Sequence, residues 1–90
     1  MEAKKLVGWN IRRLRVEHGL TIEELAADAD VAPAYLGQVE RGAANVGIVI
    51  LARVAKTLGA RLAELFVEPP PDAAPPKPLK AGRRRVKRRS

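Results

Sequence analysis

Few side chains in this chain of 90 residues could take part in covalent chemistry. The sequence has no cysteine, a single histidine, His18, and a single serine, Ser90. No set of nucleophile, base and orienting group can be assembled from them, and no glycine-rich phosphate loop is present. We therefore expect no enzyme and no cofactor. Without cysteine there is no disulfide or thiolate metal site, and one histidine does not bind a metal, so we expect no metal.

The charge of the chain indicates a binding function instead. Its excess basic side chains are concentrated at one end. Residues 1–68 contain nine Lys or Arg and nine Asp or Glu, whereas residues 69–90 contain eight basic residues and only Asp72. The whole net charge of +7 therefore belongs to the tail. Such a cluster suits the phosphate backbone of DNA. An RNA contact, an anionic membrane surface and a role in solubility are the alternatives, although we expect no membrane partner. The basic residues assigned to this contact are Lys80, Arg83, Arg84, Arg85, Lys87, Arg88 and Arg89.

Two short helices joined by a tight turn are predicted between Thr21 and Gly42. Thr21 is a good N-cap, and Glu24 follows three residues later, which is the spacing of a capping box. Pro33 suits the first position of a second helix, and Gly42 suits its end. Such a pair can place its second helix in the major groove of DNA. The alternative is two ordinary amphipathic helices in a small bundle.

Three further helices are predicted, at about residues 3–18, 48–58 and 61–67, each with an apolar face. The core is therefore expected to be aliphatic. After residue 68 six prolines interrupt any helix, so residues 1–68 form the predicted domain, and residues 69–90 a disordered, Pro-rich linker and basic tail. The positions expected to face inward in these helices are Val7, Ile11, Leu14, His18, Ile48, Leu51, Val54, Ala55, Leu58, Leu62, Leu65 and Phe66.

No apolar run approaches the length of a membrane span, and Met1 is not followed by the apolar core of a signal peptide. The expected location is the cytoplasm.

Between Leu6 and Phe66 the chain resembles the Cro/phage-repressor (Xre) family of helix-turn-helix regulators. The resemblance lies in the order and spacing of GWNIRRLR, GLTIEELA, VAPAYLGQVERG and LARVAKTLGARLAELF. It implies an all-α, five-helix, lambda-repressor-like helix-turn-helix domain that binds double-stranded DNA in a bacterial or phage-type setting, associated with the nucleoid. Restriction–modification controller proteins, a subgroup of the family, have a similar layout.

The resemblance also assigns roles to single residues. It implies a structural ion pair between Arg15 and Glu40, and a recognition helix over residues 33–41. The predicted DNA-binding residues of this helix and the following loop are Pro33, Ala34, Tyr35, Gln38, Arg41 and Asn45. Weaker contacts to the DNA backbone are predicted for Thr21, Ile22, Glu23 and Arg12.

The recognition helix departs from the family pattern in ways that reduce its polar surface. Ile22 stands where the family usually has glutamine, and Ala32 stands where a Ser or Thr cap is usual. Gln38 can pair with adenine through two hydrogen bonds, and Ala34 can contact a thymine methyl. We therefore expect modest sequence specificity per half-site, supplemented by DNA shape and dimer spacing.

A homodimer is predicted from Val49 and Ile50, which are apolar where the family is usually polar. Exposed apolar residues of this kind often mark an interface, here together with the adjacent fifth helix. The alternative is that both residues cover the core of a monomer.

These features predict a sequence-preferring, DNA-binding transcriptional regulator, a homodimer acting as a repressor. Two alternatives stay open. One is an antitoxin-type module that binds a toxin, with the Pro-rich tail as the inhibitory segment. The other is a nucleoid-type DNA binder of low specificity.

Overall fold

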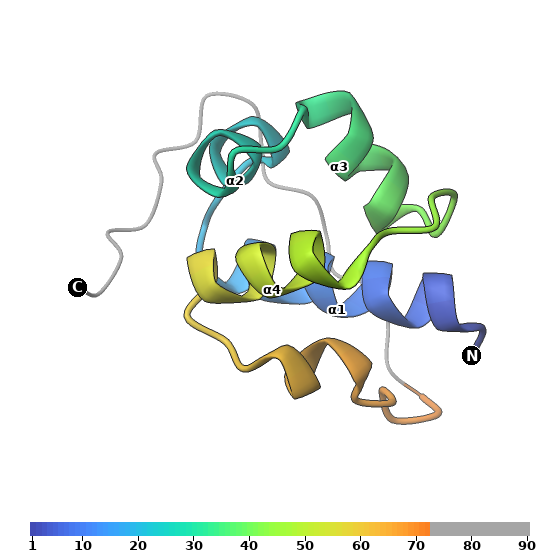
Figure 1. Cartoon of the computed structure of the whole chain (residues 1–90). Helices are drawn as coiled ribbons and strands as arrows, with labels where there is room; N and C mark the ends of the chain where they lie inside the picture. The colour runs from blue at the N-terminus through green and yellow to red at the C-terminus, as the bar shows by residue number, and fades with distance from the viewer. Residues whose placement is uncertain (73–90) are drawn as a thin grey trace.

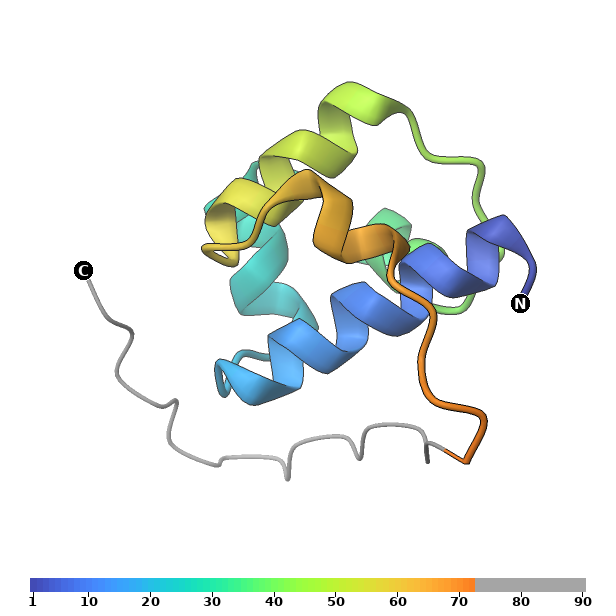
Figure 2. The same cartoon turned by 90° about the horizontal axis from the view of Figure 1, so that it is seen from below.

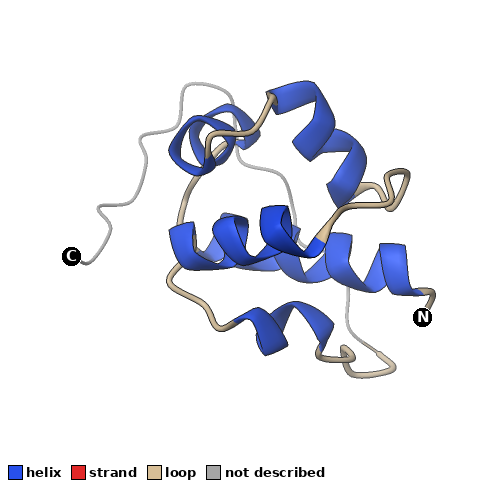
Figure 3. Ribbon diagram, in the orientation of Figure 1, coloured by secondary structure: helices blue, strands red, loops and turns tan. Residues whose placement is uncertain are grey.

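A computed structural model describes residues 1–72 of the chain, and within them every regular element is helical. The four α-helices are α1 (Ala3–Glu17), α2 (Ile22–Ala29), α3 (Pro33–Glu40) and α4 (Ile48–Thr57), and η1 (Leu62–Phe66) is a short 3-10 helix (Figures 1 and 3). The all-α domain is therefore confirmed. The predicted disorder of the tail, and all the basic residues assigned to it, lie outside the described residues.

The expectation of five α-helices is corrected, because the last element is a 3-10 helix of five residues. It is preceded by Arg61 and followed by Val67, both in extended conformations. Three prolines begin at residue 69, and a residue before proline is biased away from the α conformation. With Arg61 and Val67 both extended, only the five residues between them are left to form a helical element.

The helices pack around one core (Figure 1). α3 contacts α1 and α2, and α2 also contacts α4. η1 contacts both α1 and α4, and it lies between them when the domain is seen from below (Figure 2). The described part of the chain leaves the domain beside η1, on the side away from α3 (Figure 1).

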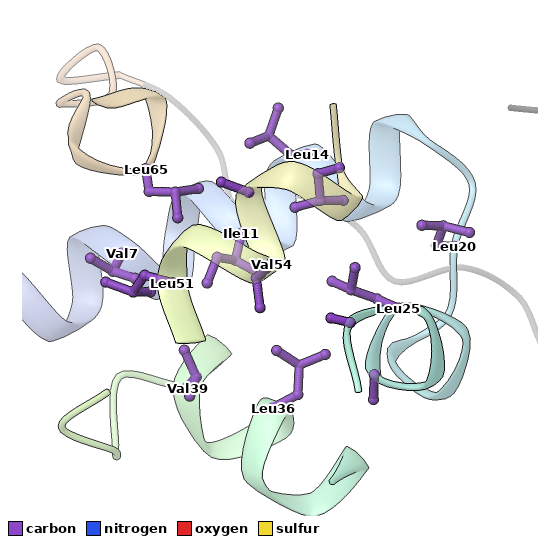
Figure 4. Close-up of a cluster of buried hydrophobic side chains, with 14 residues drawn as sticks. Val7, Ile11, Leu14, Leu20, Leu25, Leu36, Val39, Leu51, Val54 and Leu65 are labelled. Carbon is purple, nitrogen blue, oxygen red and sulfur yellow. The ribbon is translucent and has the colours of Figure 1, made fainter. Parts of the chain in front are cut away.

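The core is aliphatic, as predicted, since none of the three aromatic residues is fully buried. Every helix contributes to it, and Leu20 closes it where the chain turns from α1 to α2 (Figure 4). The labelled members of this cluster are Val7, Ile11, Leu14, Leu20, Leu25, Leu36, Val39, Leu51, Val54 and Leu65.

Two residues expected to face inward are exposed. The side chain of Phe66 is 44% exposed, because residues three apart eclipse in a 3-10 helix, so Leu62 and Leu65 share the inner side and Phe66 does not. Ile48 is 65% exposed: it is the first residue of α4, and the buried face of that helix begins one turn later at Leu51. His18 is half-buried at the end of α1.

No helix within residues 1–72 is long and apolar enough to cross a membrane.

Candidate nucleic-acid interface

The start of α2 is fixed by the capping box that the sequence predicts. The hydroxyl oxygen of Thr21 accepts a hydrogen bond from the backbone N–H of Glu24 at 3.1 Å, and a carboxylate oxygen of Glu24 accepts one from the N–H of Thr21 at 2.9 Å. Both groups would otherwise be unpaired at a helix N-terminus. The Thr21 hydroxyl therefore caps the N-terminus of α2.

The turn from α2 to α3 depends on one residue in the left-handed conformation. Asp30 has φ 58° and ψ 51°, which aspartate tolerates better than most side chains. The next N–H, of Val31, donates to the carbonyl oxygen of Ala26 at 2.9 Å and closes the end of α2. Ala32 then leads into α3 without a side-chain cap, and Pro33 takes the first helical position. The start of α3 is therefore positioned by the closing turn of α2, because α3 has no side-chain cap.

One face of α3 is free to meet a ligand. Ala34, Gln38 and Arg41 are exposed, and their spacing of four and three residues places them in one row along the helix axis. Pro33 is also exposed at the first turn. The opposite face carries the buried residues of α3, among them Leu36.

Arg41 lies back along α3. A β-carbon on Gly37 would be 3.4 Å from its Nη1 atom, so the guanidinium covers the glycine. The Arg41 side chain contributes to the burial of Gly37, and the absence of a side chain at Gly37 leaves room for it. Tyr35 is half-buried and packs against the core, so it contributes less free surface than its polarity suggested.

The predicted DNA-backbone contacts differ in their accessibility. Asn45 is exposed in the loop between α3 and α4, and Glu23 is exposed in the first turn of α2. Ile22 packs partly against the core. Arg12 is half-buried on α1, and its Nε atom is buried without a hydrogen-bond partner among the described residues. The DNA contacts of these residues remain predictions.

The ion pair expected between Arg15 and Glu40 is present and buried. Arg15 donates from Nε to one Glu40 carboxylate oxygen at 2.6 Å and from Nη2 to the other at 3.0 Å. The two side chains are 6% and 5% exposed. Arg15 also donates from Nη1 to the carbonyl oxygen of Leu20 at 2.8 Å. One guanidinium therefore ties α1 to the entry of α2 and to the end of α3.

α1 also passes unusually close to the end of α3 at Gly8. A β-carbon there would lie 2.5 Å from the carbonyl oxygens of both Val39 and Glu40. Sequence reasoning assigned Gly8 no role, although a glycine inside an otherwise regular amphipathic helix is a recognisable signal of close packing.

Two polar side chains outside the predicted site also link helices to one another through hydrogen bonds. The Nδ2 atom of Asn10, which is 1% exposed, donates to the carbonyl oxygens of Leu6, Leu65 and Val67 at 2.9–3.1 Å and so joins α1 to η1. Arg53 of α4 donates to the backbone at the end of α2. Neither role was predicted. Their acceptors are backbone carbonyls distant in sequence, which leave no mark on the sequence pattern.

The fold has counterparts among solved structures. The restriction–modification controller protein C.AhdI from Aeromonas hydrophila superposes with a TM-score of 0.68 and 36% identity, over 70% of this chain and 96% of that one. SinR, the master regulator for biofilm formation, in a structure with DNA, superposes with a TM-score of 0.65 and 34% identity, over 68% and 98% of the two chains.

The sequence comparisons agree with the structural ones. The HTH-type transcriptional regulator y4dJ of Sinorhizobium fredii strain NGR234, itself uncharacterised, is 41% identical over 75 residues, which are 83% of this chain and 95% of the relative. The helix-turn-helix family HTH_3 matches residues 11–65, a span that includes the whole of α2, the turn and α3. The chain therefore belongs to the HTH_3 (Xre/Cro-type) family of DNA-binding, helix-turn-helix transcriptional regulators, which are not enzymes.

Proposed function

We propose that this chain is a sequence-preferring repressor of transcription that binds DNA as a homodimer with α3 in the major groove. One feature carries the proposal: the exposed row of Ala34, Gln38 and Arg41 stands on a helix whose far end is fixed to α1 by the buried Arg15–Glu40 pair. A rigid helix with a free polar face fits the major groove. The presence of DNA in the structure of the related SinR supports the choice of partner.

The chemistry of this row predicts what it reads. The Gln38 amide can donate to and accept from the edge of adenine at the same time, and the Ala34 methyl can contact the methyl group of thymine. Arg41 can bind guanine through two hydrogen bonds or bind a phosphate. Few base pairs are read by so short a row, so we expect weak discrimination by a single domain.

Phosphate contacts are proposed on both sides of this row. The loop after α3 offers the exposed side chain of Asn45, and α2 offers its N-terminus, where the partial positive charge attracts phosphate. The exposed carboxylate of Glu23 opposes this attraction. The folded domain therefore provides little net attraction to DNA, in keeping with its even balance of charges.

The basic tail is proposed to supply the missing attraction. The structure describes the chain as far as residue 72, and this last described segment leaves the domain on the side away from α3 (Figure 1). The 11 residues from there to Arg83 span at most about 38 Å when fully extended. This length is comparable to the largest dimension of the domain, 32 Å, and we propose that the basic cluster contacts DNA beside the domain.

The homodimer is proposed to form through the start of α4. Val49 is 70% exposed, and Ile48 beside it is 65% exposed, so two large apolar side chains lie in water on a single chain. Ile50, the other residue predicted for this interface, is half-buried and packs against the core. A two-fold dimer would place two α3 helices roughly 34–36 Å apart, one turn of DNA. A dimer bound over a promoter blocks access to it, which is the basis for proposing repression.

Selection of binding sites from a random DNA library by the full chain tests this function. The expected product is a palindrome with two half-sites whose centres are about 10 base pairs apart. Binding without enrichment of any sequence would instead identify a nucleoid-type binder of low specificity. Replacing Arg83, Arg84 and Arg85 by alanine should weaken binding to all sequences alike and lower the salt dependence by about 0.9 per lost phosphate contact.

A further inference from the structure

Arg53 of α4 reaches across to the C-terminus of α2. Its Nη1 atom donates to the carbonyl oxygen of Asp30 at 3.0 Å and to that of Ala29 at 3.3 Å. The same atom is 4.0 Å from a carboxylate oxygen of Asp30. Because the Asp30 side chain is fully exposed, this ion pair contributes little, and the bonds to the two carbonyls matter more.

Those carbonyls lie at the point where α2 becomes the turn. The last carbonyls of a helix have no partner within it and carry a partial negative charge, which a guanidinium both bonds and balances. The backbone N–H groups of Asp30 and Val31 donate to the carbonyl oxygens of Ala27 and Ala26, respectively, one turn earlier. Arg53 thus completes the end of α2 from outside the helix-turn-helix unit.

The position of α3 depends on this turn more than is usual. Ala32 provides no side-chain cap, so no side chain of the turn accepts a hydrogen bond from the first N–H groups of α3. The far end of α3 is held by Glu40, whereas its near end is held by the buried side chain of Leu36 and by the turn from α2. Arg53 is the polar link that joins α4 to the near end.

We propose that Arg53 is a positioning residue, which fixes the α2–α3 turn to α4 and thereby sets the distance between the two recognition helices of the dimer. This inference rests on the proposed function, because it takes the start of α4 as the dimer surface. Val49 precedes Arg53 by four residues, about one helical turn, so both lie on the same side of α4. The proposed dimer contact at Val49 and the hydrogen bonds of Arg53 to the α2–α3 turn are therefore separated by one helical turn of α4.

Amide hydrogen exchange of the full chain without DNA tests the hold on the turn. In Arg53→Met, which keeps an unbranched apolar stem but removes the donors, the amides of Val31 and Leu36, which donate to the carbonyl oxygens of Ala26 and Ala32, should exchange about tenfold faster, the effect of losing one hydrogen bond to a charged group. Arg53→Lys should restore part of the protection. Lys56→Met, which removes an exposed cation from the same helix, is the control and should change nothing. Unchanged exchange in Arg53→Met would overturn the proposal.

Binding to palindromes with different spacers tests the effect on DNA recognition. The wild-type chain and Lys56→Met should prefer one spacer, whereas Arg53→Met should bind that site about tenfold more weakly and bind sites one base pair longer or shorter almost equally well. Arg53→Lys should regain much of the preference. Faster exchange with an unchanged spacer preference would refute the role in spacing. If the wild-type chain prefers no palindrome, the proposed function fails, and the exchange result still decides whether Arg53 holds the turn.

Discussion

The backbone of Gly8 lies so close to the carbonyl oxygen of Glu40 that a β-carbon at Gly8 would stand 2.5 Å from it. The same glutamate accepts two hydrogen bonds from the guanidinium of Arg15, two turns further along α1. The last turn of α3 is thus held by α1 at two points, one steric and one ionic. The exposed row of α3 owes its orientation to these contacts on its other side.

Alanine should have opposite effects at the two glycines near this contact. Gly8→Ala places a methyl against two backbone carbonyls, which cannot move without separating α1 from α3, so we expect a loss of about 1–3 kcal/mol in the free energy of unfolding. Gly37→Ala meets only the flexible end of Arg41 at 3.4 Å, and it should gain about 0.5–1 kcal/mol from helix propensity. Urea denaturation of both variants measures the difference, and equal effects would refute the close contact at Gly8.

The Arg15–Glu40 pair should behave as a buried unit. Arg15→Met or Glu40→Leu alone leaves an unpaired buried charge and should cost about 3–5 kcal/mol. The double variant leaves no charge and should cost less than the sum of the two. A double-mutant cycle by urea denaturation gives this coupling, and additive losses would show that the two side chains act independently.

The two helices of the motif differ in capping: Thr21 caps α2, whereas Ala32 gives α3 no side-chain cap. Substitutions can remove the first cap and add the second. Thr21→Ala should remove about 0.5–2 kcal/mol of stability by breaking the capping box. Ala32 already has the extended conformation of an N-cap, with φ −64° and ψ 132°. Ala32→Ser should therefore add a similar amount by capping α3. Thermal denaturation checks both, and no gain from the serine would show that the turn cannot orient a cap.

An acidic residue on α4 should separate the proposed dimer. Val49→Glu alters an exposed residue, so we expect the mass of one chain by light scattering, with a normal helical circular dichroism spectrum. Ile50→Glu is a poorer probe, because Ile50 packs against the core and its replacement would also destabilise the fold. Ala27→Glu adds the same charge to the exposed face of α2 and should leave the dimer intact. A dimeric Val49→Glu would exclude this surface.

The features predicted correctly from the sequence are those set by neighbouring residues. The capping box of Thr21 and Glu24 uses two side chains three residues apart, and Gly42 ends α3 with φ 72°. Both depend on local chemistry alone. The Arg15–Glu40 pair spans 25 residues and was reached only through the resemblance to a family.

The features that were missed depend on how the helices pack. The burial of Ile48 and Phe66 was predicted from α-helical spacing, and it failed where α4 extends beyond the core and where the last element is a 3-10 helix. The bonds of Asn10 and Arg53 end on backbone carbonyls, which every residue has, so no sequence pattern announces them.

The most direct test of the central claim, that α3 reads DNA through its exposed row, compares Gln38→Ala with Arg41→Ala on the selected palindrome and on unrelated DNA. Gln38→Ala should lose about 1–3 kcal/mol of binding free energy per half-site on the palindrome, relax the preference at one base pair, and bind unrelated DNA like the wild type. If Arg41 binds phosphate, Arg41→Ala should weaken binding to both and lower the salt dependence by about 0.9 per contact. Unchanged affinity and preference in folded Gln38→Ala would contradict the account.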